Sequence, residues 1–418
     1  MAESARASTP LPQPLPIADA DATAFLLRVG RALHRRGLPS HQLEEAMVAL
    51  CERLGVTANF FATPTALFIS FERAARAPDV YLLRVTGASP ELGKLSDIDA
   101  IGTAVVRGEL TPAEGLARIA RVEEEPPRYG PALVTAAYAL NSGAASVFFG
   151  GGFHEVVTSF LIGLVTGLWS FLFGRLGNMR AFEPVAALSA SVIACVAAIT
   201  TGEVSVHVAI LAGLIALLPG YTLVVAIAEL ANGHLASGSS RITAAFIVFL
   251  TLGFGVALGT KLTSMLLGDA PAAVVPDALP PWSQAVALGI AASTFAVIFG
   301  VKRRDLLMVL VASVLGFSGS RAGSFFLGPE LGVFIGALLV GVSANLYARV
   351  LDRPAVVPLF PGIMLLVPGS IGFQSLASLM AHDVVSGVQT AFTMVLVAVA
   401  LVAGLLLANG IAPAKRAL

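Results

Sequence analysis

The sequence predicts an α-helical polytopic membrane protein with a small α/β domain ahead of its first span. Hydrophobic residues make up 56% of the 418 residues, charged residues only 12%, and the mean hydropathy is +0.84. The charge is unevenly placed: residues 1–130 hold 14 Lys/Arg and 16 Asp/Glu, whereas residues 131–418 hold 12 and 10. Soluble domains are about a quarter charged, so the second part is suited to a lipid bilayer.

Composition also argues against several classes of function. The net charge is zero, which gives no basic surface for nucleic acid. Cys51 and Cys195 match no metal or redox spacing, so neither a metal nor a cofactor is expected. No Walker motif is present, which disfavours ATP as the energy source, and we expect no enzyme activity.

The segment before the membrane is expected to be a disordered tail (1–21), without a signal peptide, and a cytoplasmic α/β domain with its hinge (22–130). Ser40 is the expected N-cap of a helix that ends at Gly55, and Thr111, Pro112 and Glu114 predict a capping box. Periodicity and breaks predict helices over 22–37, 40–54 and 92–107, and strands over 56–62, 66–71 and 80–86. The acidic and proline-rich run 123–127 is the expected hinge. Four polar residues are expected to be solvated surface: His34, His41, Asp97 and Asp99.

About ten membrane spans follow, since a spanning helix needs about 20 mostly apolar residues. The expected spans are 131–149, 154–173, 184–201, 205–231, 242–265, 283–300, 305–320, 325–347, 355–380 and 388–411. Lys and Arg recur in alternate loops, as in the run Lys302–Arg304, with Arg321 the main exception. This bias predicts that both chain termini are cytoplasmic.

The two halves of the membrane region resemble each other. A single offset of 149 residues aligns Leu217–Gly220 with Leu366–Gly369, and Ser237–Gly238 with Ser386–Gly387. Five spans per half is an odd number, so the second copy is expected to be inverted. The predicted repeats cover 131–267 and 283–412, joined by an external loop (268–282) and followed by a cytoplasmic tail (413–418).

Proline and glycine interrupt the fourth and ninth spans at matching positions. The residues are Pro219 and Gly220 in the first half, and Pro361, Gly362, Pro368 and Gly369 in the second. Broken helices at equivalent places in inverted halves indicate a substrate site. The alternative is that each is a proline kink used only for packing.

Polar residues inside the spans are further candidates. Asn141, Ser142, Ser370 and Gln374 are placed to bind substrate, although helix–helix hydrogen bonds explain the first two equally well. Glu155, Glu229 and Glu183 are candidates for proton coupling, because carboxylates in a membrane are usually functional or paired. Each also lies near a predicted span end, where interfacial solvation is the alternative.

The chain resembles the threonine/serine exporter family. The matching stretches are Leu33–Ser40, Gly177–Arg180 with Glu183–Pro184, Leu217–Gly220, and Pro361–Gly362 through Leu366–Ser370. The resemblance implies a secondary transporter that exports small hydroxylated amino acids such as L-threonine and L-serine, driven by protons. The expected location is the bacterial cytoplasmic (inner) membrane, and the expected partners are substrate, protons and lipid, with a homo-oligomer possible.

Three other interpretations stay open on sequence alone. The substrate could be another small metabolite, such as a dicarboxylate. The membrane part could be a passive channel, in which case collapsing the proton gradient would leave efflux intact. The chain could also be a sensor or scaffold whose soluble domain does the work, although a mere anchor needs no duplicated broken helices.

Overall fold

The computed structural model describes all residues except 1–19, 74–75, 86–89, 272–273 and 414–418. Nearly all of the expected N-terminal tail lies outside the described residues. The chain forms two compact units. The soluble unit includes Asp97–Glu125 and the described chain before residue 89, and the membrane unit contains Pro90–Ser96 and Pro126–Arg416.

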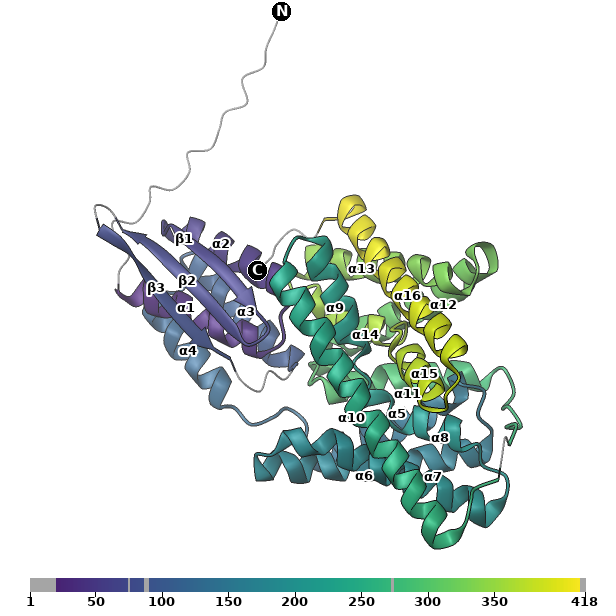
Figure 1. Ribbon diagram of the computed structural model, residues 1–418. Helices are drawn as coiled ribbons and strands as arrows, with labels where there is room; N and C mark the ends of the chain where they lie inside the picture. The colour runs from purple at the N-terminus through teal and green to yellow at the C-terminus, as the bar shows by residue number, and fades with distance from the viewer. Residues whose placement is uncertain (1–19, 74–75, 86–89, 272–273, 414–418) are drawn as a thin grey trace, which may run out of the picture. The chain divides into compact units, whose positions relative to one another are not determined.

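The soluble unit is a small α/β domain (Figure 1). Its strands form an antiparallel sheet in the order β1-β2-β3. Alternate residues of the central strand, Leu67, Ile69 and Phe71, are buried, as the period of a half-buried strand requires. The elements are α1 (Ala20–Arg35), α2 (Ser40–Leu54), β1 (Ala58–Thr63), β2 (Ala66–Arg73), β3 (Arg76–Arg84), α3 (Leu92–Val106, which belongs to this unit from Asp97 onward) and α4 (Pro112–Glu124).

Helix-capping chemistry explains where two of these helices begin and end. Thr111 and Glu114 form the predicted capping box at the start of α4, with Pro112 at its first position. Gly55 ends α2 in the left-handed conformation at φ 67°, as expected. Ser40 was expected as the N-cap of α2, and this was wrong: Pro39 is the N-cap and Ser40 is already helical.

Two of the four polar residues that were expected to be solvated surface are buried instead. His34 is 3% exposed, and its Nε2 lies 2.8 Å from the carbonyl oxygen of Thr63, which ties α1 to the end of β1. Asp99 is 8% exposed on α3. A buried polar group needs a hydrogen-bonding partner, and these pairings depend on tertiary structure that helical periodicity does not reveal.

All regular secondary structure in the described part of the membrane unit is helical (Figure 1). Among its described residues, seven helical segments are long and apolar enough to cross a membrane, and eight if the bent pair Val206–Ala231 is one span. Its helices are α5 (Pro131–Phe148), α6 (Phe153–Leu176), α7 (Phe182–Thr201), α8 (Val206–Gly213), α9 (Gly220–Ala231), α10 (Leu235–Leu267), α11 (Ser283–Ile298), α12 (Leu306–Leu327), α13 (Pro329–Leu351), α14 (Val356–Met364), α15 (Gly369–Met380) and α16 (Val384–Ile411), with short 3-10 turns η1 (Met179–Ala181), η2 (Ile215–Leu217) and η3 (Arg303–Asp305).

All ten predicted spans coincide with helices, but the count of ten spans stays a prediction. α11 is apolar but only 16 residues long, and α5 is not among the seven segments that are long and apolar enough to cross a membrane. Some boundaries were wrong. α12 continues through Arg321, which had been assigned to a loop, and α10 begins at Leu235, ahead of the expected start at residue 242. Polar residues at helix ends hid these extensions in the sequence.

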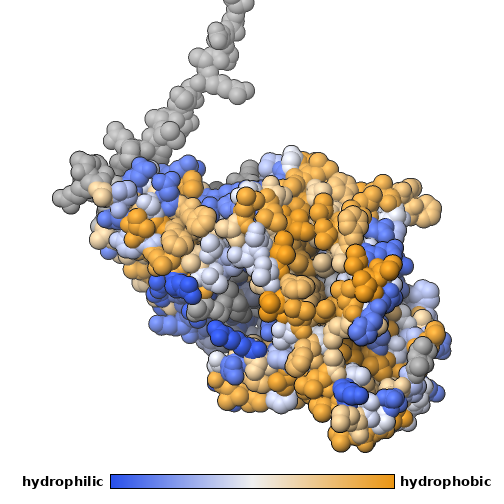
Figure 2. All heavy atoms as spheres, in the orientation of Figure 1, coloured by the Kyte–Doolittle hydropathy of each residue, from blue (hydrophilic) through white to orange (hydrophobic). Residues whose placement is uncertain are grey.

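The outer surface of the membrane unit is hydrophobic. Figure 2 shows an apolar face over α10 and α16. Large side chains on these two helices are well exposed, such as Phe254 of α10 at 64% and Phe392 of α16 at 71%. An apolar surface of this kind is suited to lipid contact.

Candidate functional site

Two spans of the membrane unit are broken at Pro-Gly pairs. The first bends by 49° between α8 and η2–α9, and α9 begins at Gly220 directly after Pro219. The second is interrupted between α14 and α15, which begins at Gly369 directly after Pro368. Both breaks were predicted.

The expected interruption at Pro361–Gly362 was wrong, because both residues lie inside α14. Pro361 is the sixth residue of a nine-residue helix. The missing N–H there removes one helical hydrogen bond, but the segment remains helical. Gly362 instead allows close packing: a Cβ placed there would lie 3.2 Å from the Cβ of Ala312 on α12.

The two breaks meet each other. A Cβ placed on Gly220 would lie 2.8 Å from the amide nitrogen of Gly369 and would overlap the side chain of Val367. A Cβ placed on Gly369 would lie 3.1 Å from both the nitrogen and the Cα of Gly220. The two backbones therefore touch at a point where only glycine fits.

Each break places the N-terminus of a 12-residue helix at this contact, α9 at Gly220 and α15 at Gly369. The first amides of a helix have no partner within the helix, and its N-terminus carries a partial positive charge. The amide of Gly220 itself donates to the carbonyl oxygen of Leu218 at 2.8 Å. The other first-turn amides of the two helices are backbone donors that suit an anionic group such as a carboxylate.

An aromatic cluster packs beside the breaks. The ring of Tyr221, the second residue of α9, lies 3.8 Å by centroid from that of Phe360 on α14. Phe360 in turn packs edge-on against Phe299 at the end of α11, at 4.5 Å. These contacts join the two broken spans to α11.

Asn141 and Ser142 lie on α5 next to the first break. Ser142 Oγ donates to the carbonyl oxygen of Gly213, the last residue of α8, at 3.0 Å. Asn141 is 1% exposed, and its Oδ1 accepts from Thr294 Oγ1 of α11 at 3.2 Å. The Nδ2 of Asn141 is buried without a hydrogen-bond partner. Ser142 therefore has the structural contact foreseen as the alternative, whereas Asn141 keeps a free donor.

Ser370 and Gln374 are half-buried on α15, directly after the second break. Residues four apart share one face of a helix, so the two side chains are neighbours in the first turns of α15. Their position next to Gly369 is what the sequence predicted, and their contact with substrate stays a prediction.

Glu229 is fully buried near the end of α9. Its Oε2 accepts hydrogen bonds from Arg241 Nε at 2.9 Å and from Ser237 Oγ at 2.7 Å, both on α10. Interfacial solvation, the alternative considered for this residue, is therefore wrong, because the carboxylate is shielded and paired with a cation.

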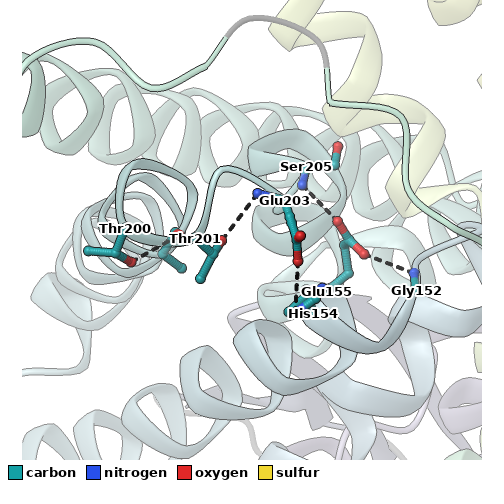
Figure 3. Close-up of polar contacts among 8 residues, drawn as sticks. Gly152, His154, Glu155, Thr200, Thr201, Glu203 and Ser205 are labelled. Carbon is teal, nitrogen blue, oxygen red and sulfur yellow. Dashed lines mark hydrogen bonds and ion pairs between the residues drawn. The ribbon is translucent and has the colours of Figure 1, made fainter.

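Glu155 is 1% exposed at the start of α6 and joins two helices (Figure 3). Its Oε2 accepts from the amide of Gly152 at 2.8 Å, and its Oε1 accepts from the amide of Ser205 at 2.7 Å, just before α8. His154 and Glu203 form a more exposed pair beside it, 3.2 Å apart. Glu155 thus caps its own helix with Oε2 and holds the start of the first broken span with Oε1. Solvation does not explain Glu155 either.

Glu183 differs from these two carboxylates. It is half-buried in the first turn of α7. This helix has no interruption and contains neither of the two Pro-Gly breaks. A carboxylate in this position is stabilised by the N-terminal end of the helix.

A further carboxylate, Asp305, escaped the sequence analysis. It lies in η3, is 1% exposed, and its Oδ1 accepts from Tyr347 Oη at 2.9 Å and from Arg353 Nη1 at 2.6 Å. The basic run Lys302–Arg304 had suggested an exposed loop. One signal was available in the sequence: Asp305 follows Glu155 at a distance that matches the repeat offset of 149 residues to within one residue. Among the described residues, no group of His, Cys, Asp or Glu is arranged to hold a metal ion.

The fold and these breaks define a class: a multi-pass membrane protein whose two interrupted helices meet. Two family models then cover most of the chain. "Putative threonine/serine exporter" matches residues 24–263, and "Threonine/Serine exporter, ThrE" matches residues 284–411. The chain belongs to the threonine/serine exporter family, as the sequence predicted.

Similar curated proteins come from fungi and are named pheromone-regulated membrane protein 10. The one from Debaryomyces hansenii is 30% identical over 369 residues, which are 84% of this chain and 36% of the relative. The relative from Saccharomyces cerevisiae is 29% identical, over 89% of this chain and 48% of its own length. The relative from Candida albicans is 30% identical, over 88% of this chain and 34% of its own length. The chain therefore spans about a third to a half of their length. No solved structure matches. These fungal relatives support a multi-pass membrane protein and lend no support to the expected bacterial inner membrane.

Proposed function

We propose that this protein is a secondary transporter that exports small hydroxylated amino acids, L-threonine and L-serine, in exchange for protons. Membership of the exporter family supports the substrate class. The observation that carries the proposal is the meeting of the two breaks at Gly220 and Gly369. Interrupted helices are tolerated at membrane depth only where they are buried in protein or line a cavity, and in transporters they bind substrate.

The substrate's carboxylate is bound by the N-terminal amides of α9 and α15, which attract anions from both sides. Ser370 and Gln374 then lie in the first turns of α15, within reach of the hydroxyl and amino groups. The buried, unpartnered Nδ2 of Asn141 supplies a further donor on α5, which packs against η2. Small amino acids carry the acceptors that this set of donors requires.

Two inverted halves rock about this contact. Three observations support the repeat. α9 and α15 have equal length and begin at residues that the repeat offset aligns, and the first residues of α10 and α16 are aligned in the same way. The halves exchange contacts, since α9 packs against α16 and α15 packs against α10. Finally, Val224 of α9 is buried in the core of the second half, and Phe373, its equivalent by the same offset, is buried in that of the first.

Glu229 is the carboxylate that exchanges the proton. In the present state its charge is balanced by Arg241 and hydrogen-bonded by Ser237. If movement of α9 against α10 separates the pair, the buried carboxylate is left without a counter-ion, and taking up one proton removes that penalty. The proton leaves again when the pair re-forms. Glu155, held by two backbone amides, is suited to positioning the start of α8.

The test is export of labelled threonine from loaded cells that make this chain, with and without a proton uncoupler. Efflux above the empty-vector control that the uncoupler abolishes is the expected result. Glu229→Gln should abolish proton-driven export in protein that still reaches the membrane. Glu203→Gln is the matched control, because Glu203 is exposed, and it should export normally.

Other outcomes would reject parts of the proposal separately. Efflux that survives the uncoupler would indicate a passive channel. No threonine or serine efflux would refute the substrate assignment and lead to a screen of other small metabolites, dicarboxylates included. Normal coupled export by Glu229→Gln would remove Glu229 from the mechanism.

A further inference from the structure

Ser313 is a buried polar residue to which the proposed function assigns no role. It lies on α12, its side chain is fully buried, and its Oγ has no hydrogen-bond partner among the described residues. Buried hydroxyls elsewhere in the membrane unit, such as those of Ser146, Thr263 and Thr294, donate to a carbonyl oxygen three or four residues earlier. A buried polar atom without a partner is uncommon and calls for an explanation.

Asn141 on α5 carries a second group of this kind. Its side chain is 1% exposed, and its Oδ1 is already bound by the hydroxyl of Thr294. Its Nδ2, within the part of the chain that the structure describes, has no acceptor. An amide nitrogen only donates, whereas a hydroxyl both donates and accepts. The two residues together therefore suit a ligand group that accepts one hydrogen bond and takes part in another.

Asn141 faces the second break from α5. It lies one turn before Ala144, and Leu365 packs against the apolar cluster that contains Ala144. Leu365 is the first residue after α14, in the interruption between α14 and α15. Residues three apart share one face of a helix, so Asn141 lies on the face of α5 that contacts this break.

Ser313 faces the same break from α12. It lies one turn before Gly316, where an added Cβ would lie 3.5 Å from Cδ1 of Leu366, the next residue of the interruption. The ring of Phe317, also one turn after Ser313, lies 5.4 Å by centroid from that of Phe148 on α5. α12 and α5 thus approach each other beside the break, and each carries an unpaired, buried polar group on the side that faces it.

We infer that Asn141 and Ser313 form the subsite that recognises the side-chain hydroxyl of the substrate. The hydroxyl oxygen accepts from Nδ2 of Asn141, and the hydroxyl hydrogen is donated to Oγ of Ser313. The carboxylate of the same molecule is bound by the N-terminal amides of α9 and α15. This inference rests on the proposed function, which it deepens by naming the residues that determine specificity.

The burial of the two groups is what makes them selective. A substrate that lacks the hydroxyl leaves both of them unpaired, and a site built around buried polar groups rejects such a substrate for that reason. Ser370 and Gln374 are only half-buried, so water can satisfy them when no hydroxyl is present. Asn141 and Ser313 therefore set the preference for L-serine over L-alanine.

The test compares export of labelled L-serine and labelled L-alanine, which differ by one hydroxyl, from loaded cells that make the full chain. The ratio of the two export rates, measured well below saturation and above the empty-vector control, cancels the amount of protein in the membrane. The parent chain should export L-serine faster. Ser313→Ala should lower the serine-to-alanine ratio at least about fivefold, because one hydrogen bond to the hydroxyl is lost, and should leave L-alanine export near the parent rate.

Two further variants make the comparison specific. Asn141→Leu removes the other partner and should also lower the ratio, and it serves if Ser313→Ala does not reach the membrane. Ser146→Ala is the matched control. Ser146 is a fully buried serine on α5 whose hydroxyl donates to the carbonyl oxygen of Gly143 in its own helix, so its removal should keep the parent ratio.

The outcomes separate this inference from the proposed function. A parent chain that exports L-serine, with a ratio that neither Ser313→Ala nor Asn141→Leu changes, would overturn the inference and leave the proposed function standing. This is the result expected if buried water satisfies both groups. An equal fall in both rates would likewise overturn it, since it would show a structural role. A parent chain that exports neither L-serine nor L-threonine would refute the proposed function and the inference with it.

Discussion

Gly220 is the position where a single added methyl group tests the contact between the two breaks. In Gly220→Ala the new Cβ would lie 2.8 Å from the nitrogen and 3.0 Å from the Cα of Gly369, and it would overlap the side chain of Val367. The backbone of Gly369 belongs to the start of α15 and cannot rotate away as a side chain can.

Overpacking of a well-packed site costs about 1–3 kcal/mol. If this strain destabilises only the conformation in which the two breaks touch, it shifts the equilibrium between this conformation and the other conformation of the transport cycle by about 5- to 150-fold. We therefore expect Gly220→Ala to reduce threonine transport at least fivefold and to lower the melting temperature in detergent. Gly289→Ala is the matched control, because a Cβ on this α11 glycine meets no atom within 4 Å.

A second variant locates the strain. Val367→Ala removes the side chain that the new methyl group overlaps, yet it leaves the backbone contact with Gly369 in place. Combined with Gly220→Ala, it should restore transport only in part. The reasoning is refuted if Gly220→Ala alone transports and melts like the parent chain, since the two breaks would then not be in contact.

Four further predictions concern other parts of the chain. Ser142→Ala removes the hydrogen bond to the Gly213 carbonyl and should destabilise the membrane unit by about 1 kcal/mol, measured as a lower melting temperature, with Ser293→Ala on α11 as an exposed control. An unchanged melting temperature would show that this bond contributes nothing. Thr111→Ala removes the cap of α4 and should cost about 1 kcal/mol, seen as about fivefold faster hydrogen exchange over Pro112–Glu124. Because hydrogen bonds from the Thr111 backbone and hydroxyl lower the pKa of Glu114, the fold favours its ionised form. Protection of α4 should thus be complete at neutral pH and weaken as the pH falls through that lowered pKa; protection that rises with acid would contradict this sign. Burial raises the pKa of the Cys51 thiol to about 12, so Cys51 should resist maleimide at pH 7.5, where rapid labelling of the folded chain would show the thiol to be accessible.

Local sequence signals predicted much of the fold. The capping box at Thr111 and the glycine end at Gly55 depend on neighbouring residues alone, and both are present. Apolar runs placed a helix at every predicted span for the same reason. The predicted helix boundaries were wrong where polar residues continue a helix, as Arg321 does in α12. The sequence alone does not indicate which polar residues remain helical at a membrane surface.

The site was harder to predict, since it depends on contacts between distant segments. The repeat offset pointed to Pro219–Gly220 and Pro368–Gly369, but it could not show that their backbones touch. Pro361 was misjudged because a proline in a short helix costs one hydrogen bond without ending it. Asp305 was missed because its partners, Tyr347 and Arg353, belong to elements far from it in the chain.

The most direct test of the account uses the full chain purified into liposomes that contain labelled threonine. A pH step that makes the exterior acidic is applied, with Gly220→Ala liposomes in parallel. The account predicts that the step accelerates threonine efflux through the parent chain, that an uncoupler removes this acceleration, and that Gly220→Ala shows at most a fifth of it. Efflux that is indifferent to the pH step, or equal in the two proteins, would contradict proton-driven transport at the meeting point of the two broken helices.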